Sequence, residues 1–350
     1  MSEELTDLTH GIIASGWFAG VVNRLRQSSV HRTGDCTHFS VLNRAMRISW
    51  DRAESIFRSA RPVTHVWEKQ FDYGDEELRR IAATPRREIK FEDLWYYYHD
   101  LCYVELQPDV FAHLFPVCLM DWHETLQRGE PCSKGDSEFH RSIYGGRILE
   151  RMVRPGQRQQ VFEFFRDSFL DRLALLESLD VEQKLGEQDP FSWLARLNSL
   201  ALVAPCVPMI WNAWWSIETP GSAVAALQYC AGLAFFDDEN PFFQSAREWM
   251  KELGRSLGQD GAAAVYFLDD SYLHDVGWLP ENLTFLRDVV TPTYIVERAQ
   301  EAARRLANSA HAKLASGVVA RLQSDPELLI SRLGELLHRL ENPTDDPWHI

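Results

Sequence analysis

The sequence predicts an all-α protein, built either as two packed helical domains or as one extended helical body. Apolar residues recur at helical spacing in several long segments, whereas strand-like character is confined to two short stretches, 263–268 and 289–290. The composition, 45% hydrophobic and 25% charged over 350 residues, is typical of a globular chain with a large core.

The first half of the chain contains five segments with helical patterns. Asp75 is placed to cap the third of them, Pro85 ends it, and Pro116 is expected to kink the fourth. Apolar residues at spacings of 3, 4, 4 and 3 put one face of the fifth helix in the core: Phe162, Phe165, Phe169, Leu173 and Leu176. The predicted helices cover 8–25, 50–59, 76–83, 109–128 and 157–176.

The second half contains six further helical segments. Thr291 and Pro292 form a start signal for a long helix, with Thr291 as the cap. Its buried stripe is predicted to be Ile295, Ala299, Ala302, Leu306, Ala310 and Leu314. Asp325 or Ser324 is expected to cap the last helix. The predicted helices cover 191–203, 209–215, 222–236, 241–257, 293–314 and a final segment that ends near Leu340.

A polar stretch at 180–190 is the predicted domain boundary. It carries Gly186 and the pair Asp189-Pro190, residues that interrupt regular structure. The sequence therefore predicts an N-terminal helical domain at 1–180 with an aromatic-rich core, a C-terminal helical domain at 190–342 and a tail at 343–350.

Net charge narrows the range of partners. The 36 basic and 51 acidic residues give 36 − 51 = −15, a charge that repels nucleic-acid phosphates and anionic lipids. No apolar run is long enough to span a membrane, and the acidic N-terminus argues against a secretory signal. We therefore expect neither a nucleic acid nor a membrane as partner, and an acidic surface suits a basic protein partner.

Six cysteines occur without a C-x-x-C pair, at positions 36, 102, 118, 132, 206 and 230. In a long chain without a secretion signal they are expected to be reduced and mostly buried thiols. The sequence therefore predicts a cytoplasmic protein.

Metal-ligating residue types are densest between 121 and 140. Two imidazoles and a thiolate are ligands that zinc prefers, and Glu124 or Glu138 could act as general base on a metal-bound water. The spacing matches neither H-x-E-x-x-H nor H-E-x-x-H, so a polar helix end followed by a solvated loop is the alternative. No cofactor is predicted outright, and zinc or another divalent metal remains an alternative. The candidate ligands are Asp121, His123, Glu124, Cys132, Asp136, Glu138 and His140.

A cluster of tryptophans, Trp211, Trp214 and Trp215, follows Pro205 and Pro208. Exposed tryptophans are typical anchors of protein interfaces, so this segment is a candidate partner-binding surface if it reaches solvent. Burial in the helical core is the alternative, and a small-molecule pocket near Trp95 or Trp211 is a third.

A set of packing residues between 52 and 176 resembles a small uncharacterised family of bacterial helical domains. The family combines an early Ala-Phe helix, a tryptophan, an aromatic-rich helix with a Leu-Pro pair, and a closing helix after a glutamine. Phe115 stands here where the family has the leucine of that pair. The resemblance implies a bacterial α-helical domain and carries no assigned activity. The matching residues are Ala53 to Phe57, Trp95, Leu106, Phe111, Phe115-Pro116, Gln159, Val161 and Phe165.

These features favour a non-enzymatic bacterial interaction protein that binds a protein partner. A regulator, an immunity factor or a defence-system accessory protein fits this description. The competing hypothesis is a metal-dependent hydrolase that uses the ligand-rich segment 121–140.

Overall fold

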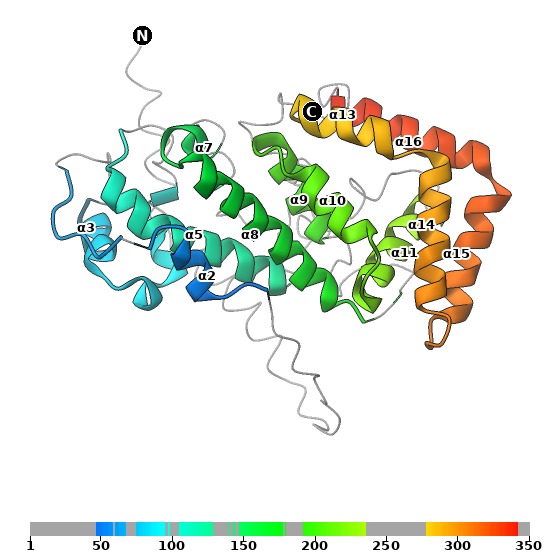
Figure 1. Ribbon diagram of the computed structural model, residues 1–350, viewed down its shortest axis with the longest axis horizontal. Coiled ribbons are helices and arrows are strands. Elements are labelled where there is room, and N and C mark those ends of the chain that lie inside the picture. Colours follow the sequence, from blue (N-terminus) through cyan, green and yellow to red (C-terminus); the bar gives the residue numbers. More distant parts are fainter. Residues whose placement is uncertain are drawn as a thin grey trace, which may run out of the picture. The chain divides into compact units, whose positions relative to one another are not determined.

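The computed structural model describes residues 47–58, 60–67, 75–94, 97–98, 105–128, 139, 143, 147–177, 179, 192–235 and 278–341. These residues form twelve α-helices, two 3-10 helices and no strand (Figure 1), which confirms the all-α class for the part of the chain described. All of them belong to the compact unit Met46–Ile350. The other unit, Met1–Ala45, lies outside the described residues, as do the predicted helices at 8–25 and 241–257 and the strand at 263–268.

The helices of the first half are α2 (Trp50–Ser55), α3 (Asp75–Ala83), η1 (Arg86–Glu88), η2 (Phe91–Leu94), α5 (Pro108–Arg128), α7 (Ile148–Arg151) and α8 (Pro155–Ala174). The four predictions at 50–59, 76–83, 109–128 and 157–176 match helices of this half to within a few residues, whereas η1, η2 and α7 were not predicted. Ser49 caps α2, because its side chain accepts a hydrogen bond from the backbone N–H of Arg52. The helix at 50–59 is thus confirmed in place but is four residues shorter than predicted.

Helix α8 is the centre of the described core. It packs against α5 on one side and against α10 (Val207–Trp215) and α11 (Pro220–Phe235) on the other (Figure 1). The predicted stripe is buried at Phe165, Phe169 and Leu173, but Val161 and Phe164 are buried as completely. A helix with neighbours on two sides buries more than one stripe, which explains why the single predicted face is too narrow.

The contact between α8 and the helices α10 and α11 crosses the predicted domain boundary. Helix α8 precedes 180–190, whereas α9 (Ser192–Val203), α10 and α11 follow it, and the buried side chains of both parts form one hydrophobic cluster. By their contacts, the residues of Met46–Ile350 form one compact unit. The division into domains at 1–180 and 190–342 stays a prediction, since packed domains would also contact each other across the boundary.

Helix α13 (Pro280–Val289) includes Val289, the first residue of the strand suggested at 289–290, and Val290 is its C-cap. That strand prediction is wrong, because α13 begins with Pro280 in its first turn and ends at Val289. Its buried Asn282 joins α9 to α10: Nδ2 donates to the carbonyl oxygens of Ala201 and Ala204, at 2.8 and 3.0 Å, and Oδ1 accepts from the Val207 N–H.

The C-terminal helices are α14 (Pro292–Arg305), α15 (Ala312–Ser324) and α16 (Pro326–Glu341). The predicted caps are confirmed, since Thr291 accepts from the Tyr294 N–H and Asp325 accepts from the Leu328 N–H. The single helix predicted over 293–314 is wrong in its second part. The chain turns after Arg305, and α15 packs back against α14 and α11, so that Leu314 is 43% exposed.

Candidate functional site

An open cleft of about 410 Å³ lies beside α2. One part of the cleft is lined by α2 and the turn after it, through Asp51, Glu54, Ser55 and Arg58. Their spacings of 3, 1 and 3 residues place them on one helical side. The remaining lining residues come from the chain around 60–62, from the start of η1 and from α5. The lining residues, here called the α2 cleft, are Asp51, Glu54, Ser55, Arg58, Ala60, Pro62, Pro85, Arg86 and His113.

Two carboxylates of the α2 cleft, those of Asp51 and Glu54, share one guanidinium. The Nε and Nη2 of Arg87, in η1, donate to the two oxygens of Glu54 at 3.3 and 2.7 Å, and Nη2 also donates to Asp51. The side chains of Arg87 and Asp51 are 53% and 85% exposed, so this contact lies at the surface. Arg87 itself is not a lining residue of the α2 cleft, but it binds the Glu54 carboxylate in the two-bond geometry that carboxylates favour.

Arg86, the neighbour of Arg87, is buried and supports the base of the cleft. Its Nε donates to the carbonyl of His113 at 2.9 Å, and its Nη2 donates to those of Ala112 at 2.8 Å and Phe57 at 3.2 Å. Pro116 has no N–H, so the Ala112 carbonyl four residues earlier has no donor within α5. Arg86 supplies that donor and joins α2, η1 and α5.

His113 is a buried imidazole of the α2 cleft, only 1% exposed. Its Nε2 lies 2.8 Å from the carbonyl oxygen of Thr84 and must donate to it, so the lone pair of the neutral ring is on Nδ1. That Nδ1 has no hydrogen-bond partner among the residues that the structure describes. Burial lowers the pKa of His113, and the nearby Arg86 lowers it further, so the ring stays a neutral acceptor near pH 7.

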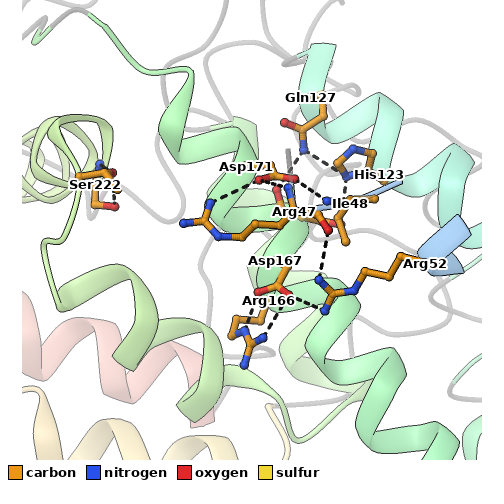
Figure 2. Close-up of polar contacts among 11 residues, drawn as sticks. Arg47, Ile48, Arg52, His123, Gln127, Arg166, Asp167, Asp171 and Ser222 are labelled. Carbon is orange, nitrogen blue, oxygen red and sulfur yellow. Dashed lines mark hydrogen bonds and ion pairs between the residues drawn. The ribbon is translucent and has the colours of Figure 1, made fainter. Parts of the chain in front are cut away.

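A second polar centre fixes the chain before α2 onto α8 (Figure 2). The Asp171 carboxylate, 3% exposed, accepts from the backbone N–H groups of Arg47 and Ile48, both at 3.0 Å. One turn earlier, Asp167 binds Arg52 at 2.5 Å and Arg166 at 2.7 Å. Burial alone would raise the pKa of Asp167, but the two arginines outweigh it and lower that pKa. These contacts set the position of α2 and hence of one wall of the cleft.

His123, the central residue of the predicted metal site, lies in α5 and faces α8. Its Nδ1 is 3.0 Å from Ser168 Oγ and 3.4 Å from Gln127 Nε2 (Figure 2). Because an amide nitrogen can only donate, Nδ1 is the acceptor and Ser168 donates to it as well. His123 is 3% exposed and Ser168 is fully buried, so the pair joins two helices away from solvent.

The other predicted metal ligands are not gathered around His123 in the part of the chain described. Glu124 pairs with Arg128 at 3.8 Å along the surface of α5, and Asp121 accepts from Tyr98 at 2.9 Å. No group of three His, Cys, Asp or Glu side chains that could hold a metal occurs among the described residues. Cys132, Asp136, Glu138 and His140 lie outside them, so the metal hypothesis stays a prediction.

Trp211, Trp214 and Trp215 are core residues, at most 1% exposed. Their rings pack against one another at 4.8 to 5.3 Å between centroids, and all three contact Tyr229. The partner-binding hypothesis for this cluster required exposed rings, so the structure assigns the three tryptophans to the alternative, packing. Trp95, the other suggested pocket residue, lies outside the described residues.

No family model, curated protein or solved structure matches the chain. The resemblance of residues 52–176 to a bacterial helical family therefore stays a prediction. None of the described helices is both long and apolar enough to cross a membrane.

Proposed function

We propose that this protein is a non-enzymatic interaction protein that binds a basic protein partner through the α2 cleft. The proposal is carried by one observation: the cleft presents two carboxylates, those of Asp51 and Glu54, on which a guanidinium already lies. A basic side chain of a partner meets the same chemistry there.

The charge of the whole chain supports this choice of partner. A net charge of −15 attracts a basic protein over distances comparable to the Debye length and raises the rate of encounter. The cleft then supplies specific contacts for the docked partner. Its base is held by Arg86, and one wall is held through the contacts of Asp167 and Asp171, so the docking geometry is formed in advance.

A bacterial, cytoplasmic protein of the regulatory or defence-accessory type is the broader role that we propose. The three described cysteines, Cys118, Cys206 and Cys230, are buried free thiols, which suits a reducing compartment. Regulators and immunity proteins act by binding another protein, so this role needs no chemistry beyond recognition.

Affinity capture from the native host tests the proposal. The tagged full chain, its Glu54→Lys variant and its Glu297→Lys variant are purified in parallel, and the proteins captured with each are quantified by mass spectrometry. Glu297 is an exposed residue of α14, so this control makes the same change of charge outside the cleft. We expect a basic protein that the unchanged chain and the control retain and that Glu54→Lys loses. An identical set of captured proteins for all three chains would contradict the proposal.

A further inference from the structure

We draw no further inference here: the strongest candidate, the side-chain cluster of the buried guanidiniums of Arg172 in α8 and Arg196 in α9, rests only on the lowering of the Arg172 pKa by burial and by Arg196, and Arg172 already donates to the Gln127 carbonyl in the last turn of α5.

Discussion

His123 shows how burial decides the role of a single residue. The sequence makes it a candidate metal ligand, and in the structure its Nδ1 accepts hydrogen bonds from Ser168 and Gln127 in the contact between α5 and α8. Burial lowers the pKa of His123 from 6.5 to about 4, because the charged imidazolium would lose its hydration there. The neutral ring is therefore part of the folded core near pH 7.

This pKa predicts how stability depends on pH. Between about pH 6.5 and 4 the unfolded chain binds a proton at His123 and the folded chain does not, so its contribution to the free energy of unfolding falls as the pH falls. The slope from this residue is about 1.4 kcal/mol per pH unit at most. His123→Gln should remove it and flatten the stability curve in that window, as measured by urea unfolding at several pH values. If His123→Gln retained the full slope, the imidazole would not be the buried neutral group that the contacts indicate.

Gly221 allows the backbones of α11 and α8 to approach each other. A Cβ at this position would lie 2.1 Å from the carbonyl oxygen of Leu173, a backbone atom that cannot move without shifting the helix. Gly221→Ala should therefore lower the free energy of unfolding by about 1 to 3 kcal/mol. Gly317, in α15, has no atom within 4 Å of such a Cβ.

Gly317→Ala is thus the matched substitution, and it should stabilise the protein by about 0.5 to 1 kcal/mol through helix propensity alone. The midpoints of urea unfolding give both values. Equal effects of the two substitutions would show that α11 does not depend on close approach to α8.

At the scale of elements, α5 and η1 depend on each other through Arg86 and Pro116. The sequence predicts a kink at Pro116, and α5 continues through this proline from Pro108 to Arg128. Pro116 has no N–H to donate to the Ala112 carbonyl. Arg86 donates to this carbonyl instead, so the buried oxygen still has a hydrogen bond.

A double-mutant cycle measures this dependence. Arg86→Met should be strongly destabilising, because it leaves buried carbonyl oxygens without donors. In the Pro116→Ala background the alanine N–H can donate to Ala112, so the same substitution should cost about 1 kcal/mol less. Strictly additive free energies of unfolding from the two changes would contradict the proposed link.

The sequence predicts most of the described helices, because their apolar spacing and their caps are local signals. Thr291 and Asp325 are examples, since each cap acts within three residues of its own position. The prediction fails where tertiary contacts decide. The helix predicted over 293–314 ends at Arg305 because α15 returns to pack against α14 and α11, and the local pattern continues past that turn.

The α2 cleft is less predictable than the helices that form it. Asp51 and Glu54 lie three residues apart on α2, which is a local relation, but Arg87 and His113 join them only through the fold. Likewise, no spacing rule relates His123 to Ser168, 45 residues away. Pairings over such sequence distances depend on how α5 and α8 pack.

At the scale of the whole molecule, α8 connects the helices on both sides of the predicted domain boundary. Its buried residues contact α5, α10 and α11 within one hydrophobic cluster. Leu173→Ala in α8 should lower the free energy of unfolding by about 2 to 5 kcal/mol and shift one common transition.

Tryptophan fluorescence and circular dichroism can follow that transition, because Trp122 lies beside α8 on α5 and Trp214 lies on α10. We expect both probes to give the same urea midpoint in the unchanged chain and the same shift in the variant. Two separate transitions, of which Leu173→Ala moves only one, would instead support independent domains on the two sides of 180–190.

Recognition of a basic partner at the α2 cleft is the central claim, and hydrogen–deuterium exchange of the full chain with and without the basic protein captured from the host tests it most directly. The claim predicts slower exchange in fragments that cover α2 and η1, at 50–58 and 85–88, and no such change in the Glu54→Gln variant. Protection confined to other segments, or protection that Glu54→Gln leaves intact, would contradict it.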